Sequence, residues 1–250
     1  MLNKPLRKKC YGRICHLPGS QTSTRDRTCN IGDRRLAIEI FPNPFYRVIV
    51  SEKLDGSSVG VAKMGSGNCI PLVRSGYRAE ETKYFQHKLF AKWVYDNFKR
   101  FNDLLRTGER ACGEWMALAH GTRYKLHHEP FVIFDIMEGN NRICQDVLQE
   151  RSSKYEFITP HIIHRGGPLP IKDALEKLGT YGFHGALDPV EGAVWRIERK
   201  KLVNPYENWG PREWRFEAIV KYVKPDKKFG CYFPERTGDK PIWNWYPSGG

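Results

Sequence analysis

The sequence lacks a membrane-spanning segment, a secretory leader and a cysteine framework. No apolar run approaches the ~20 residues that a membrane-spanning helix needs, and the first residues do not follow the charged-then-apolar order of a signal peptide. The seven cysteines are an odd number and none forms a Cys-x-x-Cys pair, which argues against a disulfide framework. We therefore expect a soluble intracellular protein of a reducing, cytoplasm-like compartment, with no membrane partner.

A zinc site is not indicated either. Cys10, Cys15, His16 and Cys29 lie close together in the sequence, but their spacing matches no zinc signature. We interpret these cysteines as free thiols and favour a structural role for His16.

Acidic residues are also few compared with basic ones. The chain has 250 residues, with 28 Asp and Glu against 41 Lys and Arg, so its formal net charge is +13. Such an excess favours a polyanionic partner, most often nucleic acid, over a basic protein without such a partner. Hydrophobic residues make up 40% of the chain, which is enough for one large domain or two small ones.

Short apolar runs bounded by turn residues predict a chain rich in strands. Helical spacing replaces this pattern over 79–106 and again over 170–178, where Pro170 stands near the first turn of the helix and Gly179 follows its end. The expected strands are 36–40, 45–50, 58–63, 69–74, 111–116, 131–136, 191–198 and 217–224. The pattern therefore predicts an α+β fold.

The stretch Lys53-Leu54-Asp55-Gly56 follows the apolar run 45–50 and precedes the next strand. Asp-Gly is a strong hairpin signal, so an ordinary solvated turn is one interpretation. The other is a lysine held at a strand end beside a glycine that lets a ligand approach the backbone. A lysine in such a place can act as a nucleophile once it is neutral.

Charged residues inside or beside later strands demand partners, because an unpaired buried charge is costly. Glu114 and Asp135 each interrupt an apolar run, and Glu191 precedes one. Lys221 and Lys224 lie in a strongly apolar strand, where a triphosphate would explain a buried lysine. Each acid could equally be paired with a buried arginine, Phe134 could be a core residue rather than a base-stacking one, and Arg74 could be a surface charge.

Taken in order, these elements resemble one family. Its motifs are matched by Lys53-x-Asp55-Gly56, Arg74-Ser75-Gly76, Gly113-Glu114, Phe134-Asp135, Glu191-Gly192 and Lys221 with Lys224. The set resembles the covalent nucleotidyltransferases, which comprise polynucleotide ligases and mRNA capping enzymes, over roughly residues 45 to 225. Within that superfamily it looks most like the ATP-dependent RNA ligases. DNA ligases and capping enzymes usually carry Arg where this chain has Ser58, and an OB-fold domain for which too few residues remain here.

The resemblance implies largely antiparallel sheets around a nucleotide cleft, with flanking helices and no OB-fold domain. It also implies ATP and Mg²⁺ (or Mn²⁺) as cofactors, and RNA with 5′-phosphate and 3′-hydroxyl ends as the substrate to be joined. We expect a basic arm over 1–35 packed on a catalytic domain over 36–225, a short aromatic tail over 226–250, and a monomer. Ser58 departs from the family, where nick-sealing RNA ligases often have Asn, and its role is open.

The same resemblance assigns roles to individual residues. Lys53 would carry AMP, Lys221 and Lys224 would neutralise phosphate charge, and Glu191 would hold the metal. Asp55, beside Gly56, would contact the ribose or the metal. The nucleotide contacts would be Arg74 and Glu114 on the ribose, Phe134 on adenine and Glu52 reading the base, with Asp135 supporting them from behind.

Chemistry adds one demand on the nucleophile. Free lysine has a pKa near ~10.4, so few molecules carry the neutral amine at neutral pH. We expect burial and a nearby cation, either Lys221 or Mg²⁺, to lower the pKa of Lys53. The rival interpretations are a capping guanylyltransferase, an ATP-dependent DNA ligase and a non-catalytic RNA-binding protein that keeps the scaffold.

Overall fold

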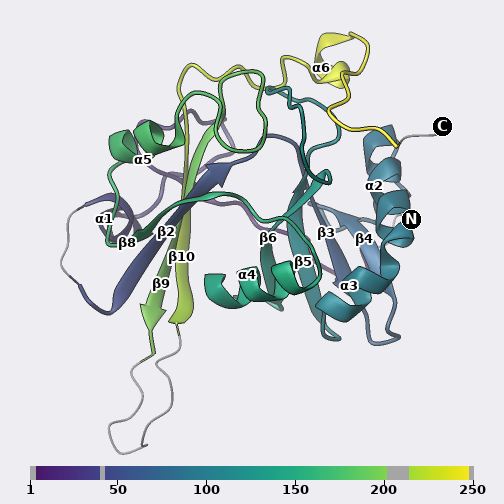
Figure 1. Cartoon of the computed structure of the whole chain (residues 1–250), viewed down its shortest axis with the longest axis horizontal. Coiled ribbons are helices and arrows are strands. Elements are labelled where there is room, and N and C mark those ends of the chain that lie inside the picture. Colours follow the sequence, from purple (N-terminus) through teal and green to yellow (C-terminus); the bar gives the residue numbers. More distant parts are fainter. Residues whose placement is uncertain (1–3, 40–42, 202–213, 248–250) are drawn as a thin grey trace, which may run out of the picture.

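Two five-stranded sheets form the frame of the computed structural model, which describes residues 4–39, 43–201 and 214–247. The first sheet has the order β1-β10-β9-β2-β8, with β1 Cys15–His16, β2 Tyr46–Lys53, β8 Ile162–Gly166, β9 Gly192–Lys200 and β10 Trp214–Val223. The second has the order β4-β3-β5-β6-β7, with β3 Ser57–Lys63, β4 Cys69–Val73, β5 Glu109–Trp115, β6 Phe131–Glu138 and β7 Asn141–Arg142. The sheets lie side by side (Figure 1). The predicted α+β class with largely antiparallel sheets is confirmed, since only the β1–β10 pair among these strands is parallel.

The register of the strands brings distant parts of the chain together. β2 and β9 pair so that Lys53 lies opposite Gly192, and β9 and β10 pair so that Val194 lies opposite Lys221. In the second sheet, Ser58 lies opposite Glu114. Residues 54–56 connect β2 of the first sheet to β3 of the second. The segment that begins at Lys53 therefore crosses between the two sheets.

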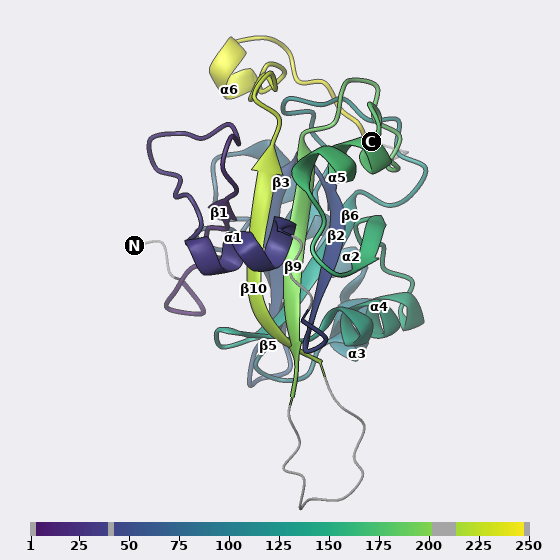
Figure 2. The same cartoon turned by 90° about the vertical axis from the view of Figure 1, so that its left-hand side faces the viewer.

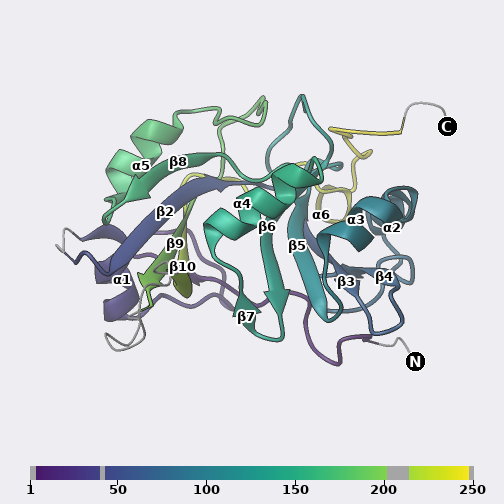
Figure 3. The same ribbon diagram turned by 60° about the horizontal axis from the view of Figure 1, so that its bottom comes forward.

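Helices cover the outer faces of both sheets (Figures 1 and 2). α1 Ile31–Ile38 contacts β2, β9 and β10, and α5 Ile171–Leu178 contacts β8 and β9. α2 Phe85–Asp96 and α3 Phe98–Leu104 contact β3 and β4 of the second sheet. α4 Gln145–Lys154 contacts β6, as Figure 3 shows from another side, and the short α6 Pro234–Thr237 lies near the C-terminus.

The strand predicted over 36–40 is wrong. Residues 36–38 form the last turn of α1, and residue 40 lies outside the described residues. Asn30 caps this helix, because its side chain accepts a hydrogen bond from the backbone N–H of Asp33 at 2.8 Å. A short apolar run fits the end of an amphipathic helix as well as a strand, and here the cap upstream decides between them.

The helix predicted over 79–106 is two helices that meet at Asn97. The predicted apolar stripe also holds only in part. Leu89, Trp93 and Phe101 are buried, whereas Phe85 and Phe98 are 54% and 40% exposed. The two exposed residues are the first residues of α2 and α3, so the predicted stripe fails at the helix starts. The helix predicted over 170–178 corresponds to α5.

Both terminal segments pack onto the sheets. Cys10 and Tyr11 are buried against Ala62, Leu72 and Cys112 of the second sheet. Near the other end, Trp243 and Trp245 pack against the core between that sheet and α2. No helix of the described residues is long and apolar enough to cross a membrane.

Candidate active site between the two sheets

A cavity of about 310 Å³ lies between the sheets, at the point where the chain crosses from β2 to β3. It brings together every predicted site residue except Lys224. These residues are Glu52, Lys53, Asp55, Gly56, Arg74, Glu114, Phe134, Glu191 and Lys221. Ser58 also lines it, and its buried hydroxyl has no hydrogen-bond partner among the described residues.

Lys53 forms an ion pair with Glu191 across this cavity. The distance from Lys53 Nζ to Glu191 Oε2 is 2.6 Å, and the lysine side chain is 19% exposed. Burial lowers the pKa of Lys53, but the carboxylates of Glu191, Glu114 and Asp55 outweigh it and hold the pKa above the usual value. The expected lowering is therefore wrong for the protein without ligands, because three carboxylates surround this amine and stabilise its charge.

Of the two lysines in the cavity, Lys221 is the one whose pKa is lowered. Burial, followed by the positive charge of Lys53, brings it to about 8. The cation that was expected to depress the pKa of Lys53 is thus itself the more easily deprotonated of the two. Among the residues that the structure describes, no carboxylate pairs with Lys221 at the short distance that joins Lys53 to Glu191, which explains the difference.

Glu114 lies beneath the turn at Gly56. Its Oε1 accepts a hydrogen bond from the Gly56 backbone N–H at 3.1 Å. Burial raises the pKa of Glu114 to about 7, with Glu191 and Asp55 raising it and Lys53 lowering it. A β-carbon on residue 56 would meet the Trp115 carbonyl oxygen at 2.5 Å. Only glycine lets the crossing segment approach β5 so closely.

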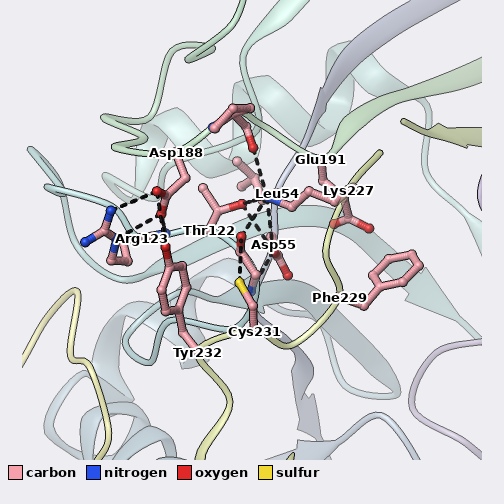
Figure 4. Close-up of polar contacts among 12 residues, drawn as sticks. Leu54, Asp55, Thr122, Arg123, Asp188, Glu191, Lys227, Phe229, Cys231 and Tyr232 are labelled. Atoms are coloured by element: carbon pink, nitrogen blue, oxygen red, sulfur yellow. Dashed lines mark hydrogen bonds and ion pairs between the residues drawn. The ribbon is translucent and has the colours of Figure 1, made fainter. Parts of the chain in front are cut away.

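The side chain of Asp55 is held by hydrogen bonds from residues 121 and 122. Its Oδ2 accepts hydrogen bonds from the Gly121 N–H at 3.0 Å and the Thr122 hydroxyl at 3.2 Å. These contacts are visible in the close-up of this region (Figure 4). These contacts engage Oδ2, so the ribose or metal role of Asp55, which stays a prediction, would use Oδ1.

Glu52 is buried, with 1% of its surface exposed, and still lines the cavity. Its Oε2 accepts the Phe183 N–H at 2.7 Å, while its Oε1 is a buried acceptor without a partner among the described residues. Burial raises its pKa to about 7. This oxygen lies against Gly182, where an added β-carbon would collide with it, so it is enclosed by protein.

The raised pKa of Glu52 leads to a stability prediction for Glu52→Gln. A carboxyl with a raised pKa stabilises the fold fully below its usual value of 4.5, and this contribution is lost as pH rises through about 7. The neutral amide can still accept the Phe183 N–H. We expect the gain of the variant in free energy of unfolding to be about 1–2 kcal/mol larger at pH 8 than at pH 4, because the pKa of this carboxyl rises from 4.5 to about 7 on folding. Urea denaturation at both pH values measures this, and an equal difference at both would contradict it.

The cavity wall that should face a nucleobase contains an aromatic pair. Phe134 and Tyr11 pack edge to face, with ring centroids 4.9 Å apart. Both line the cavity, as does Arg74, whose Nη2 donates to the Gly12 carbonyl oxygen at 3.2 Å. No pattern in the sequence predicted that Tyr11, in the N-terminal segment, would line this cavity.

Asp135 is part of a buried network behind this wall. Its Oδ1 accepts from Arg196 Nη1 at 2.9 Å and its Oδ2 from the Tyr11 hydroxyl at 2.9 Å. Arg196 also donates to Glu198 at 2.8 Å. The interpretation of a strand acid as one half of a buried ion pair therefore applies to Asp135. Arg196, which also lines the cavity, was missed, although a charged residue inside the apolar run 193–197 is the same kind of signal.

Two residues near the end of β10 differ from expectation. Lys224 does not line the cavity; its backbone N–H donates to the Glu191 carbonyl oxygen at 2.9 Å. Lys227, which the sequence did not single out, is 7% exposed and lies beside Asp55.

His16 is buried next to Ser20 and Asp26 and does not line the cavity, in line with a structural role. All seven cysteines are free thiols.

The carboxylate oxygens in the cavity fit a hard divalent cation that also binds water or phosphate oxygens. The described residues include no group of three or more His, Cys, Asp and Glu that could hold a metal by itself. Glu191 and Asp55, the two predicted ligands, both line the cavity. Mg²⁺ is commonly held through one or two carboxylates, with water and phosphate oxygens completing its coordination, and this pair fits that pattern.

Comparisons with known proteins find a matching family and similar folds. A family model described as RNA ligase matches residues 46–223. Among solved structures, a lysine-to-alanine mutant of Naegleria gruberi RNA ligase with ATP and Mn is 15% identical, with a TM-score of 0.51, covering 88% of this chain and 61% of that one. A lysine-to-methionine mutant with AMP and Mn has the same identity and TM-score, covering 84% and 59%. An archaeal ATP-dependent RNA ligase is 18% identical with a TM-score of 0.44, covering 71% and 42%.

These structural similarities concern the fold alone. The chain spans between 42% and 61% of the length of these solved ligases. A comparison of the sequence with curated proteins finds no significant match.

Proposed function

Because the chain belongs to the RNA ligase family, we propose that it is an ATP-dependent RNA ligase that forms a covalent lysyl-AMP at Lys53. The observation that carries the proposal is the cavity that joins Lys53, Glu191 and Lys221 from three strands or strand ends. In this reaction the Lys53 nitrogen bonds to the α-phosphorus of ATP, and the bond to pyrophosphate breaks. AMP then passes to an RNA 5′-phosphate, and a 3′-hydroxyl displaces it to form the phosphodiester.

The first step requires that Lys53 lose a proton. Glu191 Oε2, 2.6 Å from Lys53 Nζ, is within reach to accept it. Before a cation binds, the raised pKa of the Glu191 carboxyl, caused mainly by its burial, favours that acceptance. A divalent ion on Glu191 and Asp55 would add positive charge that opposes protonation of the amine and neutralises phosphate oxygens. Lys221 adds a second positive charge to the same cavity.

The nucleotide contacts follow from the cavity wall. Phe134 offers a ring face for adenine, and such stacking contributes about 1–3 kcal/mol per base. Glu52 lines the cavity and is the candidate for reading adenine, although its enclosed Oε1 would accept from the adenine amino group only after a shift of the segment at Gly182. Arg74 and Glu114 are the candidates for the ribose. Lys224, outside the cavity wall, would reach phosphate only through a movement of the segment after β10.

A second cavity supports RNA as the substrate. It has a volume of about 1290 Å³ and lies along the ends of β9 and β10 beside β7. Its wall carries five cations, two acids and four aromatic residues: Arg142, Arg199, Lys200, Lys201 and Arg215; Asp146 and Glu217; and Phe45, Tyr46, Trp214 and Phe216. Cations interleaved with aromatic rings are typical of surfaces that bind single-stranded nucleic acid.

Two assays test the proposal. Incubation with Mg²⁺ and α-labelled ATP should label the protein covalently, and α-labelled GTP should label it far less. The labelled protein should then seal a nicked RNA duplex bearing 5′-phosphate and 3′-hydroxyl ends. Preferential labelling by GTP would indicate a capping guanylyltransferase instead, and sealing restricted to DNA nicks would indicate a DNA ligase.

A further inference from the structure

Lys227 is a buried lysine that follows β10 and lies outside the residues matched by the family model. Its Nζ donates to the Gly121 carbonyl oxygen at 2.8 Å, the Thr122 hydroxyl at 2.5 Å and the Pro189 carbonyl oxygen at 2.8 Å. An ammonium has three N–H donors, so each has an acceptor. Figure 4 shows this amine at the centre of the polar contacts around Asp55.

The three acceptors belong to two segments that flank the reactive pair. Gly121 and Thr122 also hold Asp55 Oδ2, and Lys227 Nζ itself is 3.9 Å from that oxygen. Asp55 is two residues after Lys53, and Pro189 is two residues before Glu191. One ammonium group therefore ties the segment that carries the amine to the segment that carries its carboxylate partner.

The chain around Lys227 docks on the same two segments. The Lys224 backbone N–H donates to the Glu191 carbonyl oxygen at 2.9 Å. The Tyr232 backbone N–H donates to the His120 carbonyl oxygen at 2.7 Å, and its hydroxyl donates to Asp188 Oδ1 at 3.3 Å. Residues 224–232 thus form a strap across residues 120–122 and 188–191, with the buried ammonium of Lys227 in its middle.

Lys227 does not line the nucleotide cavity. We propose, on the basis of the function proposed above, that Lys227 is a positioning residue that holds the nucleophile Lys53 and Glu191 in reactive alignment. It acts from behind Asp55 and has no contact with ATP. A misplacement of about 1 Å at reacting atoms can cost about a hundredfold in rate.

The test is Lys227→Met, which keeps an apolar stem of similar length and removes the charge and the three donors. We expect the rate of lysyl-AMP formation at saturating ATP to fall about ten- to a hundredfold, while the apparent KM for ATP changes less than about threefold. Ground-state contacts to ATP are retained, so the loss should appear in kcat. Lys227→Arg keeps a cation and several donors and should recover most of the rate.

Two control variants separate positioning from general destabilisation. Lys228→Met alters the exposed neighbour and should leave rate and KM unchanged. Arg151→Met removes another mostly buried cation, which pairs with Glu109 at 2.5 Å away from the cavity. Arg151→Met should lower the melting temperature. At an assay temperature low enough to keep this variant folded, its kcat should not fall selectively.

The outcomes are distinct. If ATP labels the wild-type protein and a folded Lys227→Met keeps the wild-type kcat, the positioning role is overturned while the proposed function stands. Equal losses in Lys227→Met and Arg151→Met, with no recovery in Lys227→Arg, also overturn it. A wild-type protein that ATP does not label overturns the proposed function and this inference together.

Discussion

Replacement of Lys53 by alanine should reduce covalent labelling by α-labelled ATP at least about a thousandfold, to the background of the assay. The Lys53 nitrogen is the atom that would carry AMP. Binding of ATP without this nucleophile leaves no covalent label. The measurement is the label retained on the protein after denaturation, with Mg²⁺ and ATP at saturation. A Lys53→Ala protein that is labelled at a tenth of the wild-type rate or more would contradict the assignment.

Lys53→Arg provides the matched control for the Lys53–Glu191 ion pair. The guanidinium keeps the positive charge beside Glu191 but stays protonated and does not act as a nucleophile. We therefore expect Lys53→Arg to retain much of the folding stability of the wild type and to be as unlabelled as Lys53→Ala. This would separate the chemical role of the amine from its contribution to folding.

Lys221 is the main competitor for the nucleophile. Its pKa of about 8 makes it the more readily deprotonated amine in the ligand-free protein, so ionisation alone would favour it over Lys53. Mapping of the AMP adduct to a peptide decides between the two. An adduct on Lys221 would reverse their roles, and an adduct on Lys53 would mean that alignment with ATP and the metal outweighs the ligand-free pKa.

The sequence predicted the parts of the site that depend on local pattern. Lys53, Glu114, Glu191 and Lys221 each stand at the end of an apolar run or interrupt one, and such runs form strands wherever a core can bury them. The family order of motifs then places them in one cleft. The structure brings these residues to a common cavity, where strand register places Lys53 opposite Gly192.

The features that the sequence did not predict depend on contacts between distant segments. The shift in the pKa of Lys53 combines the effect of burial with the effects of three carboxylates from three segments. Neither the size nor the direction of this shift therefore follows from the local pattern. The buried amine after β10 belongs to Lys227 and not to Lys224, because the path of the chain after Val223 decides which lysine turns inward. Tyr11 lines the cavity from an N-terminal segment that has too few apolar residues in sequence to predict a helix or strand.

Glu191→Gln is expected to have the second largest effect on lysyl-AMP formation. At pH 7.5 with saturating ATP and Mg²⁺, the rate should fall at least about a hundredfold, because the change removes the proton acceptor beside Lys53 and an oxygen ligand for the cation. The rate is measured by single-turnover labelling over a range of Mg²⁺ concentrations. A variant with the wild-type rate and the wild-type Mg²⁺ dependence would contradict the role of Glu191.

The pH dependence of the residual rate tests the electrostatics separately. The Glu191 carboxylate is the largest cause that raises the pKa of Lys53, so its removal should lower that pKa, and the neutral amine should appear at lower pH. The alkaline rise of the labelling rate should therefore shift to lower pH in Glu191→Gln. Glu114→Gln removes a weaker contributor and should shift the rise less while keeping the Mg²⁺ dependence. An alkaline rise at the same pH in Glu191→Gln as in the wild type would mean that burial, and not the carboxylate, controls the ionisation of Lys53.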